Sequence, residues 1–455
     1  MLYDDVVVLI PGFFGFGRLG DFFYFADRVQ ATLRGALEAR LGRAVPVLSI
    51  AAEPASSLAS RQQTLLEQLR RVDLLLEGPA RYHLVGHSAG GVDADLLTMA
   101  QPLSPGLTWN DCDSHGIRSR VRSITTIASP HYGTNLSNSS GVAFLRDPLH
   151  HIGGATQGLG LALSLGAMVA QRSLTLDALA GVAQSGPSTR EFLVDLVLDQ
   201  DLVRDLQTSH MEALRAASVR QLFPQLVTFA TCVPTRPVAF DGVPRACDHF
   251  FARLHALTAR DAPSSTTTAA ALRILEQSAH LVIRNPSAHL GPFGVASSDG
   301  VVNTARQLLL PARLEAAAGD APDSEIARRD TAHRDTAHTS NRDATDREPS
   351  DRDTASRDPS RIEPPRDAPE PIFGGIVVAD HADVIGHYDR RDPLSLDLRG
   401  KARPINDGFF RSGAGFGDDQ FFKLYERVAD WVARAAQPGA LAGLRPPFLA
   451  LVANQ

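Results

Sequence analysis

The chain has 455 residues and a formal net charge of −6 at pH 7, and 44% of its residues are hydrophobic while 21% are charged. This length exceeds what a single hydrophobic core usually holds, so we expect one large domain with insertions, or two domains. The composition is typical of a soluble globular protein. The negative net charge and the lack of a basic cluster argue against a nucleic-acid-binding protein.

Buried apolar runs alternate along the chain with helical patterns. The run at 6–10 is ended by Pro11 and Gly12, as is typical of a parallel strand covered on both faces. Further strands are predicted at 45–50, 82–85, 121–128, 226–233 and 372–379, and helices at 27–41, 57–76, 92–100, 188–198, 202–218 and 419–436. This alternation predicts an α/β fold with a mostly parallel sheet and right-handed crossovers.

Two long stretches interrupt the alternation. Residues 135–224 are helical or glycine-rich and are predicted to form a helical cap or lid, with an ordinary helical subdomain as the alternative. Residues 316–371 repeat Arg-Asp pairs and contain almost no aliphatic residues. We expect this Arg-Asp tract to be a disordered spacer, because it cannot bury enough apolar surface to offset its ordering entropy. The core is therefore expected in three parts, at 1–134, 225–315 and 372–455.

The turn after the predicted strand at 82–85 reads GHSAG, a G-x-S-x-G pattern centred on Ser88. Between a strand and a helix this pattern predicts a nucleophile elbow, which holds a serine hydroxyl clear of the sheet. The flanking glycines allow strand and helix to approach without a Cβ collision. Ser88 is thus the predicted nucleophile, and a glycine-rich structural turn is the alternative. His87 is expected to pack inside the elbow rather than act as a base.

A serine nucleophile needs a histidine base, and the histidine needs a carboxylate that fixes its tautomer. In the fold that carries this elbow, the acid and then the histidine follow the serine along the chain. Asp299, in the turn SSDGVVN, is the predicted acid, and Asp241 in FDGVP is its main rival. His381, directly after the last predicted strand, is the predicted base, and His387 is its near rival.

The oxyanion of a tetrahedral intermediate needs two aimed backbone N–H donors. One is expected from Ala89, the residue after the nucleophile. The other is expected from Phe13, in the PGFFG loop after the first strand, with Phe14 next in line. An ordinary Gly-Phe turn remains the alternative. The several phenylalanines of this loop either wall an acyl pocket or form a core patch.

Five motifs in this order are similar to those of the bacterial true lipases of the α/β-hydrolase superfamily: PGFFG, GHSAGG, SPHYGT, SSDGVV and DHADVIG. The resemblance skips the predicted cap and the Arg-Asp tract. It implies an α/β-hydrolase fold in which Ser88 is the nucleophile, Asp299 the acid and His381 the base. It also implies that Phe13 and Ala89 donate to the oxyanion.

The resemblance implies hydrolysis of carboxylic esters of fatty acids such as acylglycerols, with a lid over an apolar cleft and transient contact of the cap with lipid. This chemistry requires no cofactor. Family members hold a structural calcium with an aspartate two residues past the base, which Asp383 matches, but no clear counterpart of the second aspartate is present. The chain also departs from the family in having Pro11-Gly12 at the oxyanion loop and NTAR, without a cysteine, after the acid turn.

Two other functions stay open. An acyltransferase or an amidase acting on lipids would use the same three residues with another acceptor. A non-catalytic α/β-hydrolase scaffold would bind proteins through the Arg-Asp tract. Intact serine, aspartate and histidine at matched positions favour an enzyme.

The cysteines Cys112, Cys232 and Cys247 form no disulfide framework and no CxxC metal pattern. Cys232 and Cys247 could pair, but isolated small core residues are the favoured interpretation. The first residues lack the basic region of a signal peptide, and the uncharged stretch 152–171 falls short of a transmembrane helix. We therefore expect a cytoplasmic protein without a transmembrane segment.

Overall fold

The computed structural model describes residues 3–13, 18–19, 22–138, 201–234, 254–255, 257–260, 262–311, 369–388, 412 and 414–437. For 18–19 and 22–23 it describes the backbone alone. The helix predicted at 188–198 and nearly all of the Arg-Asp tract lie outside these residues.

A seven-stranded sheet in the order β4-β1-β5-β6-β7-β9-β8 forms the centre of the described residues, and every neighbouring pair is parallel. The strands are β1 Asp5–Ile10, β4 Val47–Ser49, β5 Arg81–His87, β6 Val121–Ile127, β7 Gln225–Cys232, β8 Val282–Ile283 and β9 Ile372–Val378, and a separate antiparallel pair joins β2 Arg18–Leu19 and β3 Phe22–Phe23. The six predicted strands are all present. The sequence missed β8, which is too short to give an apolar run of its own.

The strand order reverses beside the predicted nucleophile. The chain passes from β1 to β4 on one side of β1 and returns to β5 on the other side. In open α/β sheets, ligands bind outside the carboxyl ends of the strands where the order reverses in this way. The carboxyl ends of β1 and β5 are followed by the PGFFG loop and by Ser88, so both lie at that point.

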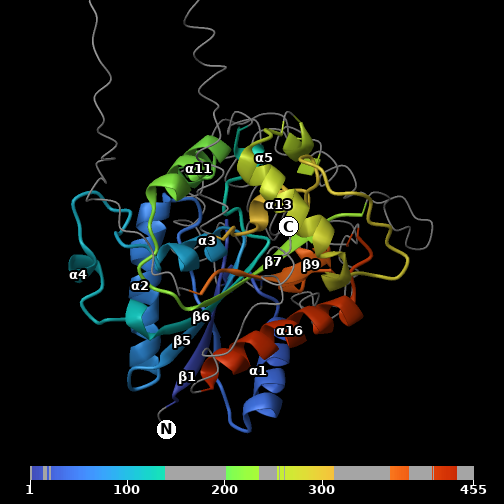
Figure 1. The fold of residues 1–455 in the computed structure, drawn as a ribbon. Coiled ribbons are helices and arrows are strands. Elements are labelled where there is room, and N and C mark those ends of the chain that lie inside the picture. The colour runs from blue at the N-terminus through green and yellow to red at the C-terminus, as the bar shows by residue number, and fades with distance from the viewer. Residues whose placement is uncertain are drawn as a thin grey trace, which may run out of the picture.

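Helices cover both faces of the sheet (Figure 1). The α-helices are α1 Asp27–Leu41, α2 Leu58–Leu75, α3 Ala89–Leu96, α4 Trp109–Cys112, α5 Asn135–Asn138, α10 Asp201–Asp205, α11 Thr208–Ala217, α13 Thr266–Gln277 and α16 Asp418–Ala436, and 3-10 turns occur at Arg118–Arg120, Ala279–Leu281, Thr304–Gln307 and Asp383–Ile385. α1 and α16 pack together on one face, while α2 and α3 lie on the other.

The side chains of β1 show why the strand is apolar throughout. Val7 and Leu9 face the core under α1 and α16, whereas Val6, Val8 and Ile10 face the core under α2. All five are completely buried. Successive residues of a strand point to opposite faces, so a strand covered on both faces needs apolar residues at every position.

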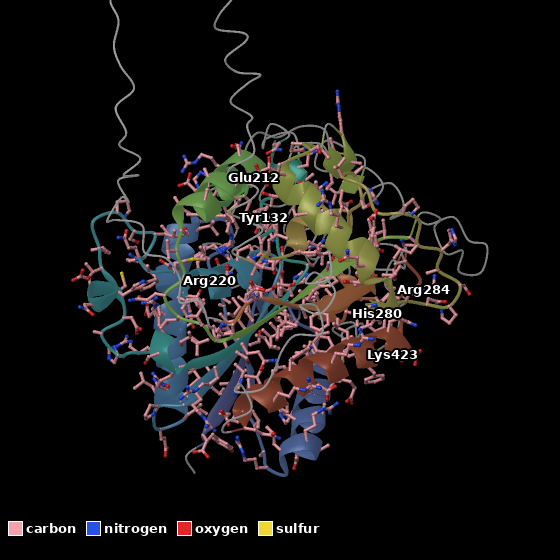
Figure 2. The ribbon with its side chains drawn as sticks, viewed as in Figure 1. Tyr132, Glu212, Arg220, His280, Arg284 and Lys423 are labelled. Carbon is pink, nitrogen blue, oxygen red and sulfur yellow. The ribbon has the colours of Figure 1, made fainter. Side chains whose placement is uncertain are left out.

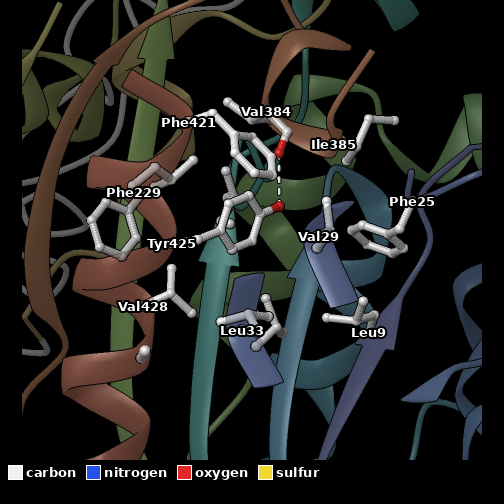
Figure 3. Close-up of a cluster of buried hydrophobic side chains, with 14 of the residues drawn as sticks. Leu9, Phe25, Val29, Leu33, Phe229, Val384, Ile385, Phe421, Tyr425 and Val428 are labelled. Carbon is white, nitrogen blue, oxygen red and sulfur yellow. Dashed lines mark hydrogen bonds between the residues drawn. The ribbon is translucent and has the colours of Figure 1, made fainter. Parts of the chain in front are cut away.

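Tyr425 brings one polar group into the core beneath α16. Its side chain packs among Leu33, Phe229 and Phe421, and its hydroxyl donates to the carbonyl of Val384 at 2.7 Å (Figure 3). Burial raises the pKa of this phenol, so it stays protonated and able to donate. This hydrogen bond connects α16 to the 3-10 turn Asp383–Ile385, which follows His381.

Replacing Tyr425 with phenylalanine should lower the free energy of unfolding by about 1–3 kcal/mol, because a buried carbonyl loses its hydrogen-bond donor. Urea denaturation followed by circular dichroism measures this change. Phe422 lies on the same helix and is 51% exposed, so Phe422→Ala should change the free energy by no more than about 0.5 kcal/mol. If the two variants lowered the free energy of unfolding equally, the Tyr425 hydrogen bond would not be the stabilising contact.

The stretch 202–218, predicted as one helix, is divided into α10 and α11. The carbonyl of Leu206 accepts a hydrogen bond from the N–H of Thr134 at 3.0 Å, and the side chain of Asn138 accepts from the N–H of Thr208 at 3.0 Å. Contacts with a distant segment therefore satisfy the backbone at the break. Amphipathic periodicity alone does not reveal such contacts.

The described end of the predicted cap is tied to the core. Asp95 of α3 is buried and forms ion pairs with Arg215 of α11 and with Arg220, the latter at 2.9 Å. Burial alone would raise the pKa of Asp95, but the two guanidinium groups lower it to about 2. Figure 2 shows Arg220 and Tyr132 beneath α11, towards the sheet. Residues 201–224 thus pack on α3, while 139–200 lie outside the described residues.

Cys112 and Cys232 are free, and Cys232 is buried. Cys247 lies outside the described residues. Within the described ranges, no helix combines the length and hydropathy needed to span a lipid bilayer.

Candidate active site

Ser88 stands alone between β5, which ends at His87, and α3, which begins at Ala89. Its backbone has φ 55° and ψ −133°, a region that costs a non-glycine residue about 1–3 kcal/mol. The N–H of Ser88 donates to the carbonyl of Ile127 on the neighbouring strand at 3.0 Å, which helps to hold this conformation. The predicted strand–turn–helix context of Ser88 is confirmed.

The glycines of the elbow are required by close backbone contacts. A Cβ added at Gly86 would lie 2.4 Å from the backbone of Gly91, and one at Gly90 would lie 2.3 Å from the carbonyl oxygen of Ile10. Contacts this short do not occur in folded proteins. The helix after the serine therefore lies directly against β5 and the end of β1.

Asp299 and His381 meet in a direct hydrogen bond. His381 Nδ1 lies 2.8 Å from Asp299 Oδ2, although the two residues are separated in the chain by the Arg-Asp tract. Asp299 is completely buried, and its Oδ1 accepts from the backbone N–H groups of Val301 and Val302 at 2.9 and 2.8 Å. The Thr231 hydroxyl donates to Oδ2 at 2.5 Å.

These contacts keep Asp299 ionised. Burial alone would raise its pKa, but the charge and hydrogen bond of His381, with the bonds from Thr231 and Val302, lower the pKa below its ordinary value. A buried carboxylate with five donors, of which Gln307 Nε2 at 3.4 Å is the most distant, is also fixed in orientation. It therefore holds the imidazole of His381 with Nδ1 protonated, which leaves Nε2 as the basic nitrogen.

The main chain of His381 lies beside the elbow. Its N–H donates to the carbonyl of Asp299 at 3.1 Å, and its carbonyl accepts from His87 Nε2 at 2.9 Å. The rings of His87 and His381 are 4.6 Å apart between centroids. The structure thus brings the histidine loop, to which the acid turn is bonded, against His87, the residue that directly precedes Ser88.

The PGFFG loop reaches Ser88 from the end of β1. A Cβ added at Gly12 would lie 2.5 Å from Ser88 Cβ and 2.9 Å from the carbonyl oxygen of His87, so only glycine fits there. Phe13, the next residue, is partly buried against a cluster that includes Ala89. Ala89 is the first residue of α3, where backbone N–H groups have no intrahelical partner. Phe14 lies outside the described residues.

A buried ion pair that the sequence analysis missed supports this loop. Arg61 of α2 binds Asp93 of α3 with Nη2 to Oδ2 at 2.6 Å, and both side chains are buried. The same Nη2 donates to the carbonyl of Pro11 at 3.0 Å. Burial raises the pKa of Asp93, and the Arg61 charge offsets part of that rise. The available signal was an arginine on the apolar stripe of an amphipathic helix, three residues after Leu58.

The rival histidine has a different environment. His387 is buried, and its Nε2 donates to the carbonyl of Tyr24 at 3.0 Å. This bond ties the histidine loop to the segment before α1. Asp241, the rival acid, lies outside the described residues.

Asp383 follows the proposed base and forms hydrogen bonds with two described residues. Its Oδ2 accepts from the N–H of Asp380 at 2.8 Å and from the hydroxyl of Ser412 at 2.6 Å. Across the described ranges, no three His, Cys, Asp or Glu side chains gather as a metal site. Calcium prefers six to eight oxygen ligands. The role of Asp383 as a calcium ligand stays a prediction.

The sheet and the site define the class of protein. A parallel sheet with a serine elbow after β5, a buried aspartate turn that follows β7 in the chain, and a histidine loop after β9 is the α/β-hydrolase fold. The expected fold is confirmed.

Comparisons with known proteins agree with the motifs. The chain is 26% identical over 139 residues to a triacylglycerol lipase of Pseudomonas fragi, a match that covers 30% of this chain and 39% of that lipase. This similarity confirms the resemblance to bacterial lipases. No protein-family model matches the chain.

Solved structures of bacterial esterases and lipases are also similar. EstA from Clostridium botulinum is 16% identical, with a TM-score of 0.45 over 95% of this chain and 87% of EstA. The lipase of Staphylococcus hyicus is 13% identical, with a TM-score of 0.41 over 95% of this chain and 96% of that lipase.

Proposed function

We propose that this protein is a serine hydrolase that cleaves carboxylic esters of lipids, acylglycerols among them, through an acyl-enzyme intermediate. The observation that carries the proposal is the 2.8 Å contact between His381 and the buried Asp299 beside the Ser88 elbow. An ion pair that served stability alone would not need to lie at the carboxyl ends of the strands next to a strained serine.

The proposed reaction begins at Ser88. His381 Nε2 takes the proton of the Ser88 hydroxyl as Oγ attacks the ester carbonyl carbon, and Asp299 stabilises the imidazolium that forms. The N–H groups of Phe13 and Ala89 bind the oxyanion. The imidazolium then protonates the departing alcohol, which leaves an ester between Ser88 and the acyl group.

Water completes the cycle. His381 takes a proton from a water molecule that attacks the acyl-enzyme, and the carboxylic acid departs as the proton returns to Ser88. An alcohol or amine in place of water would make the protein an acyltransferase. The same residues permit both outcomes, so product analysis with added glycerol or ethanolamine separates them.

A fluorophosphonate probe tests the proposal directly. The probe should label the native protein stoichiometrically, the labelled peptide should contain Ser88, and labelling should abolish hydrolysis of p-nitrophenyl butyrate. Absence of both labelling and hydrolysis would favour the non-catalytic scaffold. Labelling at another serine would overturn the assignment of the nucleophile.

A panel of esters from two to eighteen acyl carbons defines the substrate. We propose that the cap contacts lipid surfaces transiently, in which case the rate should rise sharply once a long-chain ester exceeds its solubility limit. A preference for short, dissolved esters would instead identify an esterase.

A further inference from the structure

Tyr24 connects the three loops that meet at Ser88. Its hydroxyl lies 2.8 Å from His87 Nδ1, and it also lies against Gly12, where an added Cβ would come within 2.8 Å of it. His87 Nε2 lies 2.9 Å from the carbonyl oxygen of His381. We call this series the Tyr24–His87 chain; it runs from the PGFFG loop through the elbow to the histidine loop.

The direction of each hydrogen bond follows from its partners. The carbonyl of His381 can only accept, so His87 Nε2 carries the proton. A neutral His87 then has an unprotonated Nδ1, which accepts from the Tyr24 hydroxyl. Burial, with the nearby charges of His381 and His387, lowers the pKa of His87 well below its ordinary value and favours this neutral form. Both nitrogens of His87 are therefore engaged, and His87 is not available as a base.

At its PGFFG end, the Tyr24–His87 chain contacts the peptide between Pro11 and Gly12. The carbonyl of Pro11 accepts from Arg61 at 3.0 Å, and Gly12 packs against the Tyr24 hydroxyl, which a Cβ at Gly12 would approach to 2.8 Å. These two contacts restrict the rotation of the peptide between Pro11 and Gly12. The next backbone N–H in the sequence is that of Phe13, the proposed oxyanion donor. The direction of this N–H therefore depends on the orientation of the Pro11–Gly12 peptide.

At its other end, the Tyr24–His87 chain holds the main chain of His381. The main chain of His381 is held by Asp299 at its N–H and by His87 at its carbonyl. Loss of the second contact would leave the imidazole attached to the acid turn but no longer to the elbow. The separation between His381 and Ser88 would then be less well defined.

We propose that Tyr24 and His87 are positioning residues, which hold the oxyanion loop and the histidine loop in register with Ser88. This inference rests on the proposed function. Neither residue is placed on the reacting atoms, so their removal should act on the chemical step rather than on substrate binding. Misplacement of a catalytic group by about 1 Å can lower a rate about 100-fold.

The decisive variant is Tyr24→Phe, which keeps the ring and its edge contact with Phe25 but removes the hydroxyl. With p-nitrophenyl butyrate, kcat should fall about 10- to 100-fold while KM stays within about twofold. Tyr82→Phe is the matched control: that hydroxyl is also buried and donates to the carbonyl of Leu69 at 2.8 Å, near the start of β5. The Tyr82 hydroxyl also lies 2.5 Å from Asp73 Oδ1, and neither of its partners touches the candidate site, so the control should retain the native kcat.

Substitution of His87 gives an independent measurement. The side-chain amide of glutamine can still donate to the carbonyl of His381, whereas leucine of similar volume cannot. His87→Gln should therefore retain about tenfold more kcat than His87→Leu, and the rate of phosphonylation of Ser88 should follow the same order. Thermal unfolding of each variant shows that it is folded at the assay temperature.

The outcomes separate the two proposals. Suppose that the native protein hydrolyses the ester but Tyr24→Phe has the same kcat as Tyr82→Phe. The Tyr24–His87 chain then does not position the catalytic groups, and the proposed function stands. The same conclusion holds if Tyr24→Phe raises KM while kcat is unchanged, or if His87→Leu and His87→Gln have equal kcat. If the native protein neither hydrolyses esters nor reacts with the probe, the proposed function fails and the inference fails with it.

Discussion

Replacing Ser88 with alanine should lower kcat for p-nitrophenyl butyrate by about 10⁵- to 10⁶-fold and abolish labelling by a fluorophosphonate. Alanine lacks the oxygen that forms the acyl-enzyme, so only the oxyanion donors and general binding remain to accelerate the reaction. The strained φ of 55° is no worse for alanine than for serine, so the variant should fold as the native protein does.

Ser129 provides a matched control for this substitution. It is a buried serine two residues after β6, and its hydroxyl donates to the carbonyl of Ile127 at 3.3 Å close to the elbow. Ser129→Ala should keep kcat within a few-fold of the native value. Labelling or hydrolysis that survives in Ser88→Ala would remove Ser88 from the mechanism.

Replacing Asp299 with asparagine should lower kcat about 10⁴-fold, the size seen when a triad histidine is held in the wrong tautomer. Val301 and Val302 both donate to Oδ1, so the asparagine oxygen is expected to face them. Its NH₂ group must then face His381 Nδ1 and the Thr231 hydroxyl. A donor at that position requires Nδ1 to accept, which places the proton on Nε2 and removes the base.

This prediction also decides between the two acid candidates. Asp241→Asn should leave kcat within a few-fold of the native value if Asp299 is the acid. A large loss in Asp241→Asn with little loss in Asp299→Asn would reverse the assignment. Circular dichroism of both variants controls for misfolding, because Asp299 is completely buried.

Local patterns predicted most of the fold. Buried parallel strands are continuous apolar runs, so β1, β5, β6, β7 and β9 could be read from the sequence to within about two residues. α13 was missed because its sequence TTTAAALRILEQ begins with three threonines, which favour strands when considered alone. α13 packs against Ala230 and Ile376, and this packing stabilises a helix that the local sequence does not favour.

The candidate site divides in the same way. Ser88, Asp299 and His381 each lie in a short motif whose neighbours signal the turn that presents the side chain. Tyr24 and Arg61 have no such motif, because their partners are distant in the sequence: Tyr24 and His87 are separated by 63 residues. Such supporting contacts become visible only when the loops are placed together in space.

The position of β9 between β7 and β8 has a consequence for biosynthesis. The sheet order requires that β9, although made after both of its neighbours, be inserted between them. Until residues 372–378 emerge from the ribosome, β7 and β8 both present unpaired edges, which are a hazard for aggregation. The same strand carries His381 to Asp299. In the growing chain, insertion of β9 between β7 and β8 and arrival of the proposed base are therefore a single event, so a chain that ends before β9 lacks both the pairing and the base.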